Sequence, residues 1–208
     1  MPQLRKDPVV ERWVITSTER ADRPTDFQRQ VQSPRREPCP FCPGNEGMTP
    51  PEVMSLRPVG SKGNGSGWSL RVVPNRSPVL TRGGQIDFRE EGLYELLEGV
   101  GCHEVIIETP AHEVNVGVLS EGQFEEVLRA YRSRIVDLKK DKRLCYVLVF
   151  KNQGLEAGAT LEHSHSQLVA LPVIPQAVVE ELVGATGSKE AASTAASSGR
   201  RSMGRAEW

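Results

Sequence analysis

The sequence has few cysteines, no long apolar run and no excess of charge of either sign. Four cysteines in 208 residues are too sparse for a disulfide framework, and a chain of this length can bury a core without one. With a net charge of −1, the chain lacks the excess of basic residues that is typical of proteins that bind nucleic acid. No window approaches the roughly 18 apolar residues of a membrane span, and charged residues interrupt the N-terminus where a signal peptide would be apolar. These absences favour a cytoplasmic protein with no nucleic-acid or membrane partner.

Length and composition predict one folded domain followed by a tail. A hydrophobic fraction of 38%, with 19 glycines and 15 prolines, indicates many turns or some unfolded chain. Residues 60–67 are rich in Gly and Ser and predict a flexible loop. Residues 176–183 predict the first turns of a helix. Residues 184–208 contain 15 Ala, Ser or Gly without apolar periodicity, so we expect a domain over 1–183 and a disordered tail.

Strands outnumber helices in the apolar pattern. The segments with strand composition are 12–17, 68–73, 103–109, 145–150 and 167–173. One long helix is predicted to begin after Ser120, because Ser120 and Gln123 fit a capping box. Its apolar residues share one face: Phe124, Val127, Leu128, Tyr131, Ile135 and Leu138. A single long helix that crosses between strands predicts an α+β fold with a largely antiparallel sheet.

Cys39 and Cys42 form a Cys-x-x-Cys pair surrounded by prolines and a glycine. Such a rigid knuckle suits a metal, although a redox pair or two buried thiols are the alternatives. Zinc needs four ligands, so two more must come from elsewhere in the chain, and His112 and His163 are the candidates. Cys102 and Cys145 lie in strand-like segments and are interpreted as core residues.

The segment His163-Ser-His165-Ser-Gln167 places three polar side chains at alternate positions. On an extended strand these three residues share one face. A solvated strand face is the simpler interpretation. Two features favour a site instead: the strand continues into an apolar stretch, and the glycine-containing segment 152–160 before it could wrap a phosphate with its amides.

Five motifs, in this order and spacing, resemble the N-terminal half of the galactose-1-phosphate uridylyltransferase family. They are Cys39-Pro-Phe-Cys-Pro-Gly-Asn45, Arg71-Val-Val-Pro-Asn75, His103-Glu-Val-Ile-Ile-Glu108, Phe150-Lys-Asn-Gln-Gly154 and His163-Ser-His-Ser-Gln167. The resemblance covers about residues 3–180. With serine between its two histidines, the last motif resembles the version in the branch of the family that includes plant ADP-glucose phosphorylase.

The resemblance implies a histidine-triad-like fold, with an antiparallel sheet and helices packed on one side. It implies that His165 is the nucleophile that attacks the α-phosphorus of a nucleotide sugar. The implied structural zinc ligands are Cys39, Cys42, His112 and His163, the set that counting ligands also suggested. The residues implied to line the nucleotide and its phosphates are Asn75, Asn152, Gly158, Thr160 and Gln167.

These residue types suit group transfer. A neutral imidazole is a good nucleophile near pH 7 and a good leaving group once phosphorylated. The first group to leave, a sugar phosphate, is already a stable anion, so Gln167 need not move a proton. Its amide can donate to phosphoryl oxygens instead, which favours transfer over hydrolysis.

Several functions are compatible with the sequence. The first is uridylyl transfer from UDP-glucose to a hexose 1-phosphate; the second is an ADP-glucose phosphorylase, in which phosphate accepts AMP. An inactive, zinc-stabilised fragment is a third, and a thiol-redox protein that uses Cys39 and Cys42 is a fourth. Members of the family carry a second half that supplies sugar-binding residues and part of a dimer, and the resemblance leads us to expect that this chain lacks it. We therefore expect a damaged hexose pocket, exposed apolar surface and self-association, with a homodimer as one form.

Overall fold

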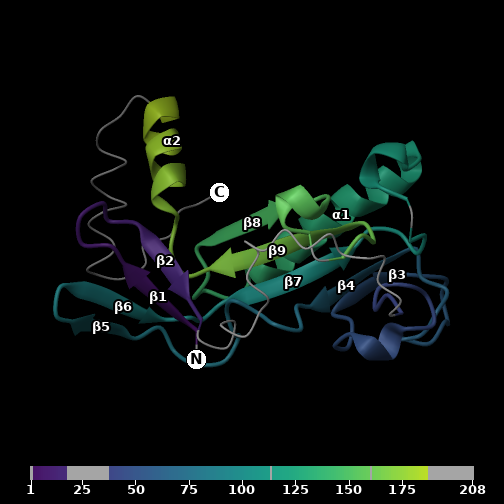
Figure 1. Cartoon of the computed structure of the whole chain (residues 1–208), viewed down its shortest axis with the longest axis horizontal. Helices are drawn as coiled ribbons and strands as arrows, with labels where there is room; N and C mark the ends of the chain where they lie inside the picture. Colours follow the sequence, from purple (N-terminus) through teal and green to yellow (C-terminus); the bar gives the residue numbers. More distant parts are fainter. Residues whose placement is uncertain (1, 18–37, 113, 160, 187–208) are drawn as a thin grey trace.

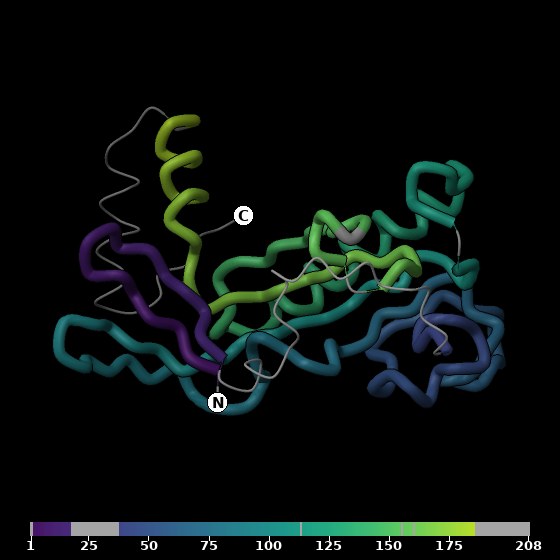
Figure 2. The backbone as a smooth tube through the Cα atoms, viewed as in Figure 1, coloured from purple at the N-terminus to yellow at the C-terminus, as the bar shows by residue number. Residues whose placement is uncertain are grey.

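The computed structural model describes residues 2–17, 38–112, 114–159 and 161–186. The molecule is elongated and consists mainly of two antiparallel sheets, with the smaller sheet at one end (Figures 1 and 2). The five strands of the larger sheet are, in spatial order, β3 (Met54–Leu56), β4 (Leu70–Pro74), β7 (Cys102–Ile107), β9 (His165–Leu171) and β8 (Tyr146–Phe150). Those of the smaller sheet are β2 (Trp13–Thr16), β1 (Gln3–Lys6), β6 (Tyr94–Glu98) and β5 (Phe88–Glu91). The predicted α+β class with antiparallel pairing is confirmed.

Helix α1 (Glu121–Leu138) covers one side of the larger sheet. Its predicted capping box is present, with Ser120 Oγ accepting from Gln123 N. The buried stripe differs from the predicted one, because Phe124 and Leu128 are 43% and 49% exposed. Of the predicted stripe, Val127 and Leu138 are buried and Tyr131 and Ile135 pack against the same core. Ala130 and Arg134 are buried as well, and the Arg134 guanidinium donates to the buried Glu104 carboxylate, with Nε–Oε2 and Nη2–Oε1 distances of 2.7 Å.

Strand β9 presents different residues to the two sides of the sheet. Leu168 and Ala170 belong to the core beneath α1. Val169 and Leu171, on the other side, pack against the smaller sheet through Leu4 and Leu97. The apolar end of that second side is thus covered. Its polar beginning, at His165 and Gln167, lies beyond the smaller sheet's core and carries the candidate site.

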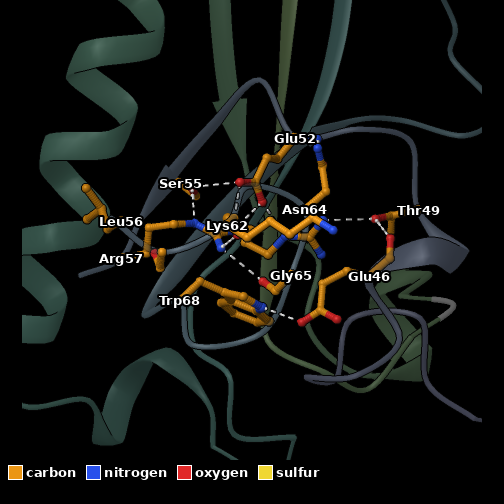
Figure 3. A network of polar contacts seen from close by, with 12 residues as sticks. Glu46, Thr49, Glu52, Ser55, Leu56, Arg57, Lys62, Asn64, Gly65 and Trp68 are labelled. Carbon is orange, nitrogen blue, oxygen red and sulfur yellow. Dashed lines mark hydrogen bonds and ion pairs between the residues drawn. The ribbon is translucent and has the colours of Figure 1, made fainter. Parts of the chain in front are cut away.

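The Gly- and Ser-rich loop before β4 is anchored rather than loose (Figure 3). The Arg57 side chain donates to the carbonyls of Lys62 (2.5 Å) and Gly65 (3.1 Å). Asn64 Oδ1 accepts from the backbone N–H of Glu52 at 2.7 Å. These bonds hold residues 62–65 against the β3–β4 hairpin, so the expectation of a flexible loop is not met there.

Glu52 also receives the fully buried Arg71 guanidinium, with Nε–Oε2 at 2.9 Å. Beside this pair, Trp68 Nε1 donates to Glu46 Oε1 at 2.8 Å (Figure 3). Glu46 Oε2 also accepts from Gly44 N at 3.0 Å. Glu46 begins the short 3-10 helix Glu46–Met48, directly after the Cys-x-x-Cys knuckle. The β3–β4 hairpin therefore supports the knuckle through this buried carboxylate.

The remaining helical segments are the 3-10 turns Val116–Val118 and Leu155–Ala157, and helix α2 (Gln176–Thr186). The predicted helix at 176–183 is thus present and continues three residues further. Residues 187–208, where most of the expected tail falls, lie outside the described part of the chain. Among the described helices, none has the length and apolarity needed to cross a membrane.

Candidate functional site

Four predicted metal ligands converge at one end of β9. The Sγ atoms of Cys39 and Cys42 and one ring nitrogen each of His112 and His163 all lie within 4.8 Å of one another. The cysteines come from the knuckle, where Cys42 N bonds to Cys39 O at 3.2 Å. His112 comes from the turn after β7, and His163 precedes β9. The structure therefore brings together the whole predicted quartet, in a geometry able to hold one metal ion.

The hydrogen bonds of His163 prepare it as a ligand. Its Nε2 lies 2.7 Å from the Thr109 carbonyl and donates to it, which leaves the Nδ1 lone pair facing Cys39 and Cys42 at 3.8 and 3.6 Å. Burial lowers the pKa of His163, so the ring is neutral, as a ligand must be. His112 Nδ1 lies 3.3 Å from Cys42 Sγ. Burial, followed by the neighbouring Cys39, raises the pKa of Cys42, so a bound metal would displace its proton.

His165 is oriented by the backbone of this same ligand. Its Nδ1 lies 2.8 Å from the His163 carbonyl and donates to it, so the lone pair is on Nε2. Among the described residues, no hydrogen bond engages Nε2. Burial lowers the pKa of His165 and keeps the ring neutral. The Phe41 ring packs edge-on against it, with centroids 5.3 Å apart.

His165 lines a cavity of about 380 Å³, a size suited to a small ligand. Asn152, His112 and His163 line it too, together with Lys151 and Gly154. Gly154 and Gly158 have φ of +81° and +77°, and Ala159 N bonds to Gly154 O at 3.1 Å, so residues 154–159 form a turn that only glycine permits at these two positions.

The other predicted nucleotide-binding residues are placed differently. Asn75 and Gln167 do not line this cavity. They meet at His103, whose Nε2 lies 3.0 Å from Asn75 Nδ2 and 2.9 Å from Gln167 Oε1. Gln167 shares its side of β9 with His165, as predicted. Thr160 lies outside the described residues.

Sequence reasoning missed a buried network on the opposite side of β9. Glu108 Oε2 accepts from Lys151 Nζ (2.7 Å) and Ser164 Oγ (2.6 Å), and Glu108 Oε1 accepts from Ser166 Oγ and from the Tyr131 hydroxyl. Lys151 Nζ also donates to the His165 carbonyl at 3.0 Å. These bonds hold the pKa of Glu108 below its usual value against the opposing effect of burial. The signal was available as a charged residue that directly follows the apolar strand 103–107.

Comparison with known proteins shows which family this chain resembles. Residues 79–175 match the family described as galactose-1-phosphate uridyl transferase, N-terminal domain. The chain is 41% identical over 188 residues to ADP-glucose phosphorylase of Arabidopsis thaliana, covering 88% of this chain and 52% of the relative. It is 28% identical over 186 residues to galactose-1-phosphate uridylyltransferase of Thermotoga maritima, covering 89% and 51%.

Solved structures agree. A uridylyltransferase structure matches with a TM-score of 0.67 and 31% identity, covering 89% of this chain and 50% of that one. The structure of Arabidopsis ADP-glucose phosphorylase with bound ADP-glucose matches with a TM-score of 0.57 and 36% identity, covering 90% and 56%. The fold is of the α+β, histidine-triad-like type. Over residues 79–175 the chain is similar to the N-terminal domain of galactose-1-phosphate uridylyltransferase, and it spans about half the length of the relatives it matches.

Proposed function

We propose that this chain is a nucleotidyltransferase that takes a nucleotide from a nucleotide sugar onto His165, with UDP-glucose as donor and hexose 1-phosphate as acceptor. The observation that carries the proposal is the state of His165: a buried neutral ring, held by Nδ1, with its Nε2 lone pair available at a polar cavity. Nε2 attacks the α-phosphorus, and the bond from phosphorus to the bridging oxygen breaks. Glucose 1-phosphate leaves with that electron pair, and the acceptor's phosphate oxygen later displaces His165.

The surrounding groups support this assignment without proton transfer to the leaving group. Asn152 lines the cavity beside His165, and the glycine turn at 154–158 brings backbone close to it. Asn152, Gly158, Thr160 and Gln167, with Asn75, are proposed to contact the nucleotide and its phosphates. A glutamine amide donates hydrogen bonds to phosphoryl oxygens but cannot act as a general acid near pH 7, which suits a leaving group that is already an anion.

We propose zinc as the metal held by Cys39, Cys42, His112 and His163. For tetrahedral zinc, with bonds of about 2.3 Å to sulfur and 2.05 Å to nitrogen, each sulfur-to-nitrogen edge is roughly 3.6 Å. The sulfur-to-nitrogen distances from Cys42 to His112, from Cys42 to His163 and from Cys39 to His163 are 3.3, 3.6 and 3.8 Å. When bound, zinc would act structurally: it would fix His163, and the His163 carbonyl in turn orients His165.

A second candidate is an ADP-glucose phosphorylase, in which phosphate accepts AMP from His165. The higher identity favours it: 41% to the Arabidopsis ADP-glucose phosphorylase against 28% to the Thermotoga uridylyltransferase. Since the chain spans about half of either relative, a zinc-stabilised form without turnover is the third candidate. We further propose that residues 1–183 act as one domain, that the chain forms a homodimer, and that its free thiols suit a reducing, cytoplasmic compartment.

The test is covalent trapping on the full chain. Zinc-loaded protein is mixed with UDP-glucose or ADP-glucose, quenched in alkali to preserve the phosphorus–nitrogen bond, and read by intact mass. A uridylyl or adenylyl adduct that is absent in His165→Ala supports the transfer chemistry and identifies the donor. A folded, zinc-loaded chain that gains no mass with either donor would refute both transferase candidates and leave the form without turnover.

A further inference from the structure

The structure assigns a positioning role to His103: its Nε2–H fixes the side-chain amide of Gln167, so that the NH₂ group rather than the carbonyl oxygen is left to meet the phosphoryl group. This inference rests on the proposed function. Of the four histidines, His103 is neither a proposed metal ligand nor the proposed nucleophile. It lies on β7, between β4 and β9, and is 5% exposed.

The backbone determines the tautomer of His103. The N–H of Val79 donates to His103 Nδ1 at 3.2 Å, so Nδ1 must be a bare acceptor. A neutral imidazole carries one proton, which is therefore on Nε2. His103 presents one donor, in a fixed direction, toward the side chains of Asn75 and Gln167.

Only one of these two amides can accept that proton. Asn75 Oδ1 is already engaged by the backbone N–H of Ser77 at 2.9 Å, so Asn75 turns its NH₂ toward His103. Gln167 must then present Oε1, which lies 2.9 Å from Nε2. With the proton on Nε2, the Asn75 NH₂ at 3.0 Å makes a contact with that nitrogen and not a hydrogen bond, so Gln167 Oε1 is the acceptor that these two amides offer to Nε2–H. A reversed Gln167 amide would remove that acceptor.

The consequence is chemical. An unconstrained amide can present either end to a phosphoryl group, and its carbonyl oxygen would repel the negative charge that Gln167 is proposed to stabilise. His103 removes the wrong orientation before substrate binds, which is the preorganisation that makes such donors effective. His103 touches no reacting atom and acts through Gln167.

The kinetic test is a double-mutant cycle on the full chain. Single-turnover formation of the His165 adduct is measured for wild type, His103→Phe, Gln167→Ala and the double variant. Gln167→Ala is expected to slow the reaction about 100-fold and His103→Phe about 10-fold or more. The double variant should be no more than about 3-fold slower than Gln167→Ala, because the two residues act as a unit. His103→Gln, which restores a donor near the Nε2 position, should recover most of the rate. Multiplicative losses, or no rescue, would overturn the inference.

A measurement without turnover separates this inference from the proposed function. A long-range ¹H–¹⁵N spectrum of the ligand-free wild type should show His103 as the Nε2–H tautomer, and a proton on Nδ1 would refute the inference even if every adduct formed. If wild type forms no adduct, the proposed transfer fails, while the spectrum still decides how Gln167 is held. The spectrum also remains decisive if His103→Phe does not fold.

Discussion

His163 performs two tasks with different atoms. Its ring nitrogens face Cys39, Cys42 and the Thr109 carbonyl, and its own carbonyl holds the neighbouring His165. The proposed metal quartet and the proposed nucleophile are therefore joined by a single residue. Replacing His163 should therefore impair both metal binding and adduct formation, whereas replacing the His165 side chain should impair adduct formation alone.

We predict that His165→Ala abolishes adduct formation while the protein still binds one zinc per chain. His163→Ala should lose zinc and adduct together, because it removes one of four ligands. Metal content by mass spectrometry and adduct by intact mass give the two readouts. Stoichiometric zinc in His163→Ala would contradict the quartet, and an adduct in His165→Ala would contradict the nucleophile.

Glu108 is a buried carboxylate whose side chain is fully shielded from solvent. Replacing it with glutamine should destabilise the protein by about 3 kcal/mol, since Lys151 would lose its counter-charge and the two serines a shared acceptor. Urea denaturation measures this loss. The matched control is Glu125→Gln on the surface of α1, where the pair with Arg129 is exposed and the change should stay below about 0.5 kcal/mol.

The difference in the free energy of unfolding between wild type and Glu108→Gln should depend on pH with a defined sign. The folded pKa of Glu108 is held below 4.5 by Lys151, Ser164 and Ser166. A lowered carboxyl pKa adds stability above the unfolded value, and this stability disappears as the pH falls through the folded value. The gap between wild type and Glu108→Gln should thus be full at pH 7 and shrink below about pH 4.5. A gap that widens on acidification would be inconsistent with an ionised Glu108.

At the scale of helices and strands, the sequence predicts an element best where the pattern of neighbouring residues alone determines it. The capping box fixes the start of α1, and alternation along 163–167 predicts which side chains share a face. Strands β1, β3, β5 and β6 were missed because their composition is unhelpful: β5 reads Phe-Arg-Glu-Glu and is exposed throughout. Such strands form through long-range pairing, as Leu4 with Leu97 shows, and single-segment patterns do not contain that information.

The same distinction applies to the site. The metal quartet could be predicted because the Cys39–Cys42 pair supplies two of the four ligands that zinc needs, and His112 and His163 were the candidates for the other two. The His103–Gln167 contact could not, because it depends on the diagonal placement of two residues on neighbouring strands, Val105 being opposite Gln167 and His103 opposite Val169. Lys151 likewise gains its role only once β8 lies beside β9.

The anchored loop before β4 gives an element-scale prediction. Arg57→Ala removes the donor to the Lys62 and Gly65 carbonyls and the ion pair with Glu52. Amide hydrogen exchange over residues 60–67 should become faster, while exchange in β9 stays unchanged. Arg89→Ala, which removes an exposed pair on β5, is the control and should leave the loop as it is. Equal exchange in wild type and Arg57→Ala would mean that these bonds do not hold the loop.

For the whole molecule, the metal should be part of stability and not only of activity. Chelation of zinc is expected to lower the melting temperature by roughly 5–10 °C, because a ligand bound well above its dissociation constant contributes several kcal/mol to a chain of this size. Cys145→Ser, outside the quartet, should respond to the chelator as wild type does. Cys42→Ser should begin at the lower melting temperature and be insensitive. An unchanged wild-type transition after complete metal removal would argue against a structural metal.

Because the two sides of β9 face different groups, a change in the length of this strand should have other effects than a substitution in it. Ser166, Leu168 and Ala170 face α1, while His165 faces the cavity and Gln167 lies on the same side of the strand as His165. Deleting a single codon at the start of this strand would invert the alternation downstream, sending Gln167 under the helix and a leucine into the site. A point substitution changes a side chain on one side of the strand, whereas an in-frame change of length displaces the side chains on both sides. Length polymorphism should collect instead in segments that connect the strands.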